Sequence, residues 1–252
     1  MSSSGEMPVS SRCGLQFLGW CVHGYTALGL VAAAAIAELL VQGGAEANRR
    51  IFFLMLAATL IDATDGTLAR WVRVKEVLPG FDGRRLDDLV DFLTYSCLPL
   101  FLIWRAALLP SGCESILLLP LLASAYGFCQ TSVKTDDGYF LGFPSYWNLV
   151  AFYLYVLQPL EVWFTVGLLV LFSLLTFVPS RYLYPSQRGR LNRITAMLGL
   201  LWTLLLVWII WLMPDDRTRP LAVVSLFFPA WYLALSWILS VRLWRRKLMC
   251  KE

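Results

Sequence analysis

The chain has 252 residues, of which 58% are hydrophobic and only 15% are charged. A soluble domain contains about 45–50% apolar and about 25% charged residues, so this composition excludes a water-soluble globule. The formal net charge of +4 is too small to indicate a nucleic-acid partner, and the 11 Trp and 10 Tyr residues are typical of a protein bordered by bilayer interfaces. These values predict an all-α, polytopic integral membrane protein.

Transmembrane segments follow one another along most of the chain. The first dozen residues are polar, and we expect no cleaved signal peptide there. Six apolar segments approach or exceed the roughly 20 residues that a helix needs to cross the hydrocarbon core: 19–42, 50–71, 88–110, 115–132, 194–213 and 220–243. The remaining apolar block, 145–178, is about 51 Å long as one helix, and Pro159 and Glu161 interrupt it. We therefore predict two short spans there, and about eight spans in one membrane domain covering 1–252.

Basic residues set the predicted orientation, because cytoplasmic loops carry an excess of Lys and Arg. With eight spans and both termini in the cytoplasm, 16 of the 21 Lys and Arg residues lie on the inner side. Seven spans would place the basic tail RLWRRK outside, against this rule. At the start of the chain, residues 13–22 form either a short interfacial helix or the leading end of the first span.

The end of the second span carries two acidic residues after a long apolar run. Asp62 and Asp65 are three residues apart and therefore share one face of a helix. A carboxylate in a membrane segment costs about 2.5–3.5 kcal/mol on insertion scales, so it indicates a function by default. The structural alternative is that both acids merely pair with Arg70 or Arg84.

The start of the third span repeats this acidic pattern. Gly83, Asp87 and Asp91 follow one another at four-residue steps along one helix stripe, whereas Asp88 points elsewhere. A short cytoplasmic connection joins spans two and three, so we expect the two acidic stripes to face each other. Four carboxylates without His or Cys favour Mg²⁺ or Mn²⁺. Acids at a helix start are also favoured by the helix dipole, which is the structural alternative for Asp87 and Asp88.

Small and basic residues accompany the acids. Gly66 and Ala69 leave room for a phosphate, and Arg70 supplies a bidentate partner for it. The whole pattern reads Asp62-x-x-Asp65-Gly66-x-x-Ala69-Arg70, then Gly83-x-x-x-Asp87-x-x-x-Asp91. It resembles the signature of the CDP-alcohol phosphotransferase family at every position. The 12 residues between Arg70 and Gly83 exceed the common family spacing, and this longer gap resembles the branch of bacterial phosphatidylcholine synthases.

The resemblance implies a site at which a divalent cation and a CDP-linked lipid meet. By similarity, the metal ligands are Asp62, Asp65, Asp87 and Asp91, with Asp91 also the general base. The implied CDP-binding residues are Asp62, Gly66, Ala69, Arg70, Gly83 and Asp87. The implied reaction transfers the phosphatidyl group of CDP-diacylglycerol to choline and releases CMP. The implied setting is a bacterial inner membrane among its lipids, with the site facing the cytoplasm, and the family suggests a homodimer.

Choline carries a quaternary ammonium group, which aromatic faces typically bind. Tyr95 lies four residues after Asp91, and Tyr146 and Trp147 begin the fifth span, close to the acidic pair at 136–137. Membrane-interface belts are rich in Trp and Tyr without any ligand, so each aromatic residue also has a structural explanation. The stretches KTDDGYFLGFPSYWN (134–148) and, more weakly, RYLYPS (181–186) resemble phosphatidylcholine synthases as well.

Two other assignments stay open at the level of sequence. The first is another CDP-diacylglycerol transferase that uses serine, glycerol phosphate or inositol as the acceptor. The second is a transporter, which also uses intramembrane acids but more often distributes them near the bilayer midplane over several spans. His23, the only histidine, receives no role.

Overall fold

The structure, a computed structural model, describes residues 9–130, 139–183 and 190–249. Helices dominate these residues, which confirms the predicted all-α membrane class. In chain order, the helical elements are α1 (Val9–Gln42), α2 (Ala45–Val72), α3 (Val74–Val77), α4 (Gly83–Asp91), the π-helix η1 (Phe92–Cys97), α5 (Leu98–Arg105), the 3-10 helix η2 (Glu114–Leu117), α6 (Leu118–Cys129), α7 (Trp147–Val156), α8 (Val162–Phe177), α9 (Arg190–Leu212), α10 (Thr218–Ser225) and α11 (Phe227–Met249).

Four helical segments are long and apolar enough to cross a bilayer: Cys13–Gln42, Ala45–Val72, Arg193–Leu212 and Thr218–Ile238. Shorter apolar helices occupy Glu114–Cys129, Trp147–Val156 and Trp163–Phe177. The predicted break in the 145–178 block is confirmed, because α7 ends before Pro159 and α8 begins after Glu161. A count of eight spans stays a prediction.

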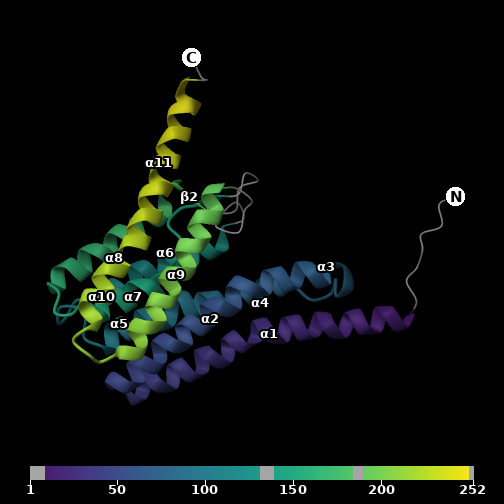
Figure 1. The fold of residues 1–252 in the computed structure, drawn as a ribbon, viewed down its shortest axis with the longest axis horizontal. Coiled ribbons are helices and arrows are strands. Elements are labelled where there is room, and N and C mark those ends of the chain that lie inside the picture. The colour runs from purple at the N-terminus through teal and green to yellow at the C-terminus, as the bar shows by residue number, and fades with distance from the viewer. Residues whose placement is uncertain (1–8, 131–138, 184–189, 250–252) are drawn as a thin grey trace.

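α1 is one continuous helix that lies along α2 (Figure 1). Its 34 residues extend about 51 Å at about 1.5 Å per residue, well beyond a hydrocarbon core of about 30 Å. Residues 13–22 are therefore the leading end of this helix and not a separate interfacial helix. Phe17 and Trp20 in this end are exposed, as expected for side chains at a membrane boundary.

The third predicted span is built from three consecutive segments, α4, η1 and α5. Within η1, the N–H of Leu98 bonds to the carbonyl of Leu93, five residues earlier. Pro99 explains this wider turn, because proline has no N–H and its ring would clash with the carbonyl four residues before it, that of Tyr95. The π-turn therefore follows directly after Asp91 and carries Tyr95.

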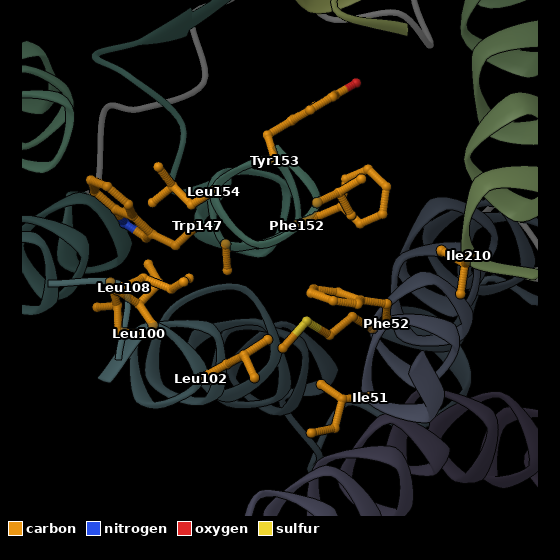
Figure 2. Packing of buried hydrophobic residues seen from close by; sticks show 14 of the residues in the cluster. Ile51, Phe52, Leu100, Leu102, Leu108, Trp147, Phe152, Tyr153, Leu154 and Ile210 are labelled. Atoms are coloured by element: carbon orange, nitrogen blue, oxygen red, sulfur yellow. The ribbon is translucent and has the colours of Figure 1, made fainter. Parts of the chain in front are cut away.

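The main hydrophobic core joins helices that are far apart in the sequence (Figure 2). Phe52 of α2 meets Phe152 of α7 edge to face, with ring centroids 5.3 Å apart. Leu102 of α5 and Ile210 of α9 are buried in the same cluster. On the outside of α9, large apolar side chains such as Trp211 are exposed. Such a surface is stable when lipid tails cover it.

Two short antiparallel strands, β1 (Tyr139–Leu141) and β2 (Arg181–Leu183), connect the two loop stretches that resemble phosphatidylcholine synthases. Tyr139 pairs with Leu183, and Leu141 pairs with Arg181. The N–H of Gly142 then bonds to the carbonyl of Ser180 at 2.9 Å. The strand pair therefore joins the segment before α7 to the segment after α8. The acidic pair at 136–137 lies outside the described residues.

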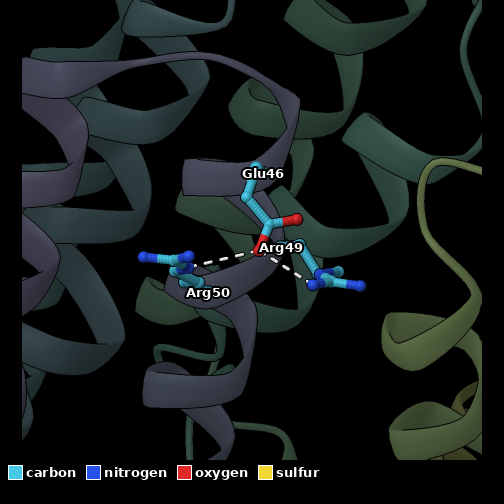
Figure 3. A network of polar contacts seen from close by, with 3 residues as sticks. All are labelled: Glu46, Arg49 and Arg50. Atoms are coloured by element: carbon cyan, nitrogen blue, oxygen red, sulfur yellow. Dashed lines mark hydrogen bonds and ion pairs between the residues drawn. The ribbon is translucent and has the colours of Figure 1, made fainter.

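The start of α2 carries a small charged cluster (Figure 3). Glu46 Oε1 lies 2.8 Å from Nη2 of Arg49 and 3.2 Å from Nε of Arg50. Exposed pairs of this kind contribute about 0–1 kcal/mol to stability. These two arginines belong to the side that the charge pattern assigns to the outside, and the acidic motif occupies the other end of the same helix.

Candidate active site

Three carboxylates from two helices meet between the second half of α2 and α4. Asp62 comes from α2, whereas Asp87 and Asp91 come from α4. One carboxylate oxygen from each lies within 4.8 Å of the other two, and all three side chains are half-buried. Asp88, which the helical spacing places on another face of the helix, is not part of this group. The structure thus brings together three of the four acids singled out in the sequence.

A capped helix start holds the two acids of α4 in place. Asp82 Oδ1 accepts hydrogen bonds from the N–H groups of Arg84 and Arg85, at 3.2 and 3.3 Å. The first backbone donors of a helix need such partners. Because the helix begins at a defined residue, Asp87 and Asp91 occur one turn apart on a single face.

Asp65, the fourth acid, faces α1 and lies outside the group of three. It is 5% exposed, and its Oδ2 accepts a 2.7 Å hydrogen bond from the hydroxyl of Thr26. Thr26 was not predicted from the sequence as part of the site. A threonine in an apolar helix usually bonds to its own backbone, as Thr26 also does to the Val22 carbonyl at 3.4 Å, so no local signal marked it.

Tyr95 is hydrogen-bonded directly to a member of the acidic group. Its hydroxyl donates a 2.7 Å hydrogen bond to Oδ2 of Asp62. The ring is buried, and its centroid lies 6.3 Å from that of Tyr146. Behind it, the amide of Asn148 on α7 donates to the hydroxyl of Thr59 on α2, at 3.2 Å. Polar contacts therefore tie α7 to the turn of α2 that precedes Asp62.

Trp147 occupies a different environment from Tyr95 and Tyr146. It is fully buried, and its indole N–H donates a 2.7 Å hydrogen bond to the hydroxyl of Ser124 on α6. Its ring lies edge to face against Phe143, at 6.0 Å. Trp147 therefore packs between helices as part of the core (Figure 2).

The remaining motif residues of α2 lie on its last two turns. Arg70 is exposed, and its Nη2 donates a 3.0 Å hydrogen bond to the hydroxyl of Thr67. A Cβ atom placed on Gly66 would lie 3.4 Å from Nη1 of the same arginine. Ala69 is half-buried one residue before it. The small residues Gly66 and Ala69 thus lie next to an exposed guanidinium, as a phosphate-binding role requires.

The three grouped acids fit a divalent cation. Like charges at these distances repel one another, and a bridging cation removes that repulsion. The donor atoms are all carboxylate oxygens, the ligand type that Mg²⁺ and Mn²⁺ prefer. Oxygen atoms that lie within 4.8 Å of one another reach a shared Mg²⁺ at about 2.1 Å with small side-chain movements.

Comparison with known proteins places the chain in a family. No protein-family model matches the chain. A phosphatidylcholine synthase of Pseudomonas aeruginosa is 33% identical over 227 residues, which is 90% of this chain and 91% of the relative. The chain belongs to the phosphatidylcholine synthase family. A second member, from Bradyrhizobium diazoefficiens, is 34% identical over 89% of this chain and 82% of its own length. A third, from Legionella pneumophila, is 41% identical over 174 residues.

Membership in the phosphatidylcholine synthase family confirms the resemblance that the acidic motif carries. It also favours a membrane-bound transferase over a transporter. The matches to the first and second of these relatives extend over about nine tenths of the chain, far beyond the 30 residues of the motif. The likeness therefore includes the helices on both sides of the acidic group.

Proposed function

We propose that this chain transfers the phosphatidyl group of CDP-diacylglycerol to choline. The observation that carries this proposal is the group of Asp62, Asp87 and Asp91 in a member of the phosphatidylcholine synthase family. In the reaction, the choline hydroxyl oxygen forms a bond to the lipid-side phosphorus. The bond from that phosphorus to the bridging oxygen breaks, and CMP leaves with the bonding electrons.

Asp91 is the proposed general base, and it receives the proton of the choline hydroxyl. It lies in the acidic group one turn after Asp87 and directly before the π-turn. A carboxylate takes the proton of an alcohol efficiently only when the alcohol is held against it. The π-helix η1, which carries Tyr95, begins at the residue after Asp91.

Asp62, Asp87 and Asp91 are the proposed ligands of the divalent cation, Mg²⁺ or Mn²⁺, and Asp65 is proposed as a fourth. When bound, the cation supplies stabilisation for the negative charge that develops on the leaving phosphate. The hydroxyl of Tyr95 holds one oxygen of Asp62, and the hydroxyl of Thr26 holds one oxygen of Asp65. Hydrogen bonds of this kind orient ligating carboxylates.

The nucleotide of the donor is proposed to bind at the ends of the two motif helices. Arg70 pairs with a phosphate of CDP, since its guanidinium is exposed at the end of α2. Gly66, Ala69, Gly83 and the acids Asp62 and Asp87 line the rest of this site, by similarity to the family motif. The acyl chains of the donor then lie along the apolar helices.

Choline is proposed to bind on the faces of Tyr95 and Tyr146. Their rings are neighbours, and Tyr95 connects them to the acidic group through Asp62. The quaternary ammonium interacts with aromatic faces and donates no N–H hydrogen bond. Because Trp147 is fully buried, we assign it a supporting role. It follows Tyr146 in the sequence, and its contact with α6 holds the start of α7 in position.

The proposed location is the bacterial inner membrane, with the acidic group and both termini on the cytoplasmic side. The Arg and Lys distribution supports this orientation. Water-soluble choline and CMP then exchange with the cytosol, and the family suggests a homodimer. A second acceptor class, serine, inositol or glycerol phosphate, lacks the quaternary ammonium for which the aromatic pair is suited.

Product analysis tests the function directly. Purified protein in detergent receives CDP-diacylglycerol with radiolabelled choline, serine, inositol or glycerol phosphate, each in a separate reaction. We expect phosphatidylcholine and CMP in equal amounts with choline, and no lipid product with the other alcohols. A product formed from serine without turnover of choline would assign the chain to the alternative acceptor class.

A further inference from the structure

His23 of α1 lies directly against the first residue of α4, Gly83. A Cβ atom built on Gly83 would overlap with Cε1 of the His23 ring and would lie 2.8 Å from Nδ1. Any side chain at position 83 would therefore have to displace the imidazole or move the start of α4. Alanine has a higher helix propensity than glycine, so local helix formation gives no reason for glycine here.

The imidazole is buried and has two aromatic neighbours. His23 is 6% exposed. Its ring centroid lies 4.4 Å from that of Phe81 and 5.9 Å from that of Trp20. Trp20 and Phe81 also contact each other, at 5.2 Å. These three rings form a wedge, defined as Trp20, His23 and Phe81, between α1 and the turn that precedes α4.

Two further contacts along the same face of α1 fix its distance from the motif helices. Thr26 donates its hydrogen bond to Asp65. One turn later, Gly29 approaches α4 so closely that a Cβ atom there would overlap with Cγ1 of Val90. These contacts follow His23 at three-residue steps, so one stripe of α1 meets both α2 and α4. α1 therefore packs along one face against both helices that carry the acidic group.

Nε2 of His23 is buried and has no hydrogen-bond partner among the residues that the structure describes. A phenyl ring would fill a similar space without burying an unpaired nitrogen. A substitution of His23 by phenylalanine therefore keeps a ring against Gly83 and removes the polar nitrogen atoms. This separation allows a steric role to be tested on its own.

We propose that His23 is a positioning residue for the transfer reaction. Its ring, held by Trp20 and Phe81, sets the position of Gly83 and thereby of Asp87 one turn later in α4. Asp87 must reach the carboxylate of Asp62 across the gap between the helices, so a shift of the helix start changes the acidic group. This inference rests on the proposed role of Asp62 and Asp87 in metal binding.

The test is a pair of complementary substitutions. In Gly83→Ala, the added methyl group displaces α4, and we expect kcat to fall about 100-fold, as misplacements of about 1 Å do. In the double variant Gly83→Ala with His23→Ala, the space is restored, and we expect kcat at least about tenfold above that of Gly83→Ala, because the effects of substitutions at contacting residues are not additive.

Gly80→Ala and Gly24→Ala are matched controls. A Cβ atom at either position has no atom within 4 Å, so both variants should leave kcat unchanged.

A metal readout distinguishes positioning from general loss of structure. We expect the Mn²⁺ concentration for half-maximal activity, and for half-maximal thermal stabilisation of the purified protein, to rise in Gly83→Ala and to recover in the double variant. His23→Phe retains the ring shape and should keep both values near those of the parent chain. His23→Trp enlarges the ring and should reproduce the Gly83→Ala defect without any change at position 83, which covers the case in which Gly83→Ala does not fold.

Two results would overturn the proposal. The first is a double variant as inactive as Gly83→Ala while His23→Ala alone is active, because Gly83 would then be needed by the ligand itself. The second is a His23→Trp variant with normal kcat and normal Mn²⁺ response. Failure of the underlying metal site is recognised separately, because Asp87→Asn would then keep the full Mn²⁺ response whatever the variants at position 23 do.

Discussion

The hydroxyl of Thr26 on α1 donates a 2.7 Å hydrogen bond to Oδ2 of Asp65 on α2. Both residues are buried, at 6% and 5% exposure. A hydrogen bond to a charged carboxylate is stronger than one between neutral groups. One oxygen of a motif acid is therefore held by a helix that the motif does not include. The contact makes α1 part of the scaffold for the acidic group.

Loss of this hydrogen bond should destabilise the protein. Thr26→Val keeps the shape of the side chain but leaves Asp65 without its donor, and we expect a loss of about 1.5–3 kcal/mol. Thr26→Ser should retain most of the stability. Thermal unfolding in detergent measures the difference. Tyr25→Phe is the control, because the hydroxyl of Tyr25 bonds to Thr64 at an exposed position. Equal melting temperatures for Thr26→Val and the parent chain would contradict this expectation.

The three neighbouring aspartates on α4 should differ sharply in function. Asp87→Ala and Asp91→Ala remove members of the acidic group, and we expect CMP release to fall by more than about 100-fold. Asp88→Ala should retain most of the activity, since Asp88 is outside that group. Initial rates of CMP release at saturating substrates measure the effect. Similar losses at Asp87 and Asp88 would show that the face assigned to the site is wrong.

Local periodicity explains why the acidic group was predictable. The step from Asp87 to Asp91 matches one helical turn, and a short connection makes α2 and α4 neighbours, so the convergence with Asp62 follows from sequence alone. The break between α7 and α8 was predictable for a similar reason, because Pro159 stands in the middle of the apolar block and a proline in a helix interior removes a backbone hydrogen bond and clashes with the preceding turn.

Contacts between distant segments were not predictable in this way. The pairing of Thr26 with Asp65, and of β1 with β2, depends on how whole helices pack, and no local pattern encodes it. The burial of Trp147 was missed because aromatic residues at a membrane boundary look alike in sequence whether they face a ligand, lipid or the core. The π-turn after Asp91 has a local cause in Pro99, but a spacing of four residues between Asp91 and Tyr95 predicts only a regular helical turn.

Activity should depend fully on a divalent cation. Without one, the carboxylates of Asp62, Asp87 and Asp91 repel one another, and the charge on the departing CMP has no counterion. We expect EDTA to abolish phosphatidylcholine formation and added Mg²⁺ or Mn²⁺ to restore it. Full activity in a sample shown by elemental analysis to be metal-free would disprove the metal site.

The orientation of the chain can be checked at the connection between α2 and α4. Lys75 lies in α3 and is exposed, and we expect it to face the cytoplasm. In a variant whose only cysteine replaces Lys75, a membrane-impermeant thiol reagent should label opened cells but not intact ones. A cysteine at Arg49, near the start of α2, should already be labelled in intact cells. Labelling of the Lys75 position in intact cells would invert the proposed topology.

Tyr146 and Trp147 should respond differently to substitution, because Tyr146 lies beside Tyr95, which bonds to Asp62, whereas Trp147 lies in the core. Tyr146 is half-buried next to the ring of Tyr95, whereas Trp147 is fully buried against α6. Removal of a core tryptophan costs about 3–5 kcal/mol of stability. We therefore expect Trp147→Ala to lower the melting temperature strongly and Trp147→Phe to recover part of that loss.

For Tyr146, we expect a selective effect on the acceptor. Tyr146→Ala removes one aromatic face, and the loss of about 0.5–2 kcal/mol of cation–π interaction raises the KM for choline several-fold to about thirtyfold. The KM for CDP-diacylglycerol should barely change, and Tyr146→Phe should keep the choline KM near that of the parent chain because the aromatic face remains. Tyr95→Phe keeps its face but loses the hydrogen bond to Asp62, so it should lower kcat without raising the choline KM. Steady-state kinetics with each substrate varied in turn separate these outcomes. An unchanged choline KM in both Tyr146→Ala and Tyr95→Ala would exclude this aromatic pair as the choline site and leave the family membership intact.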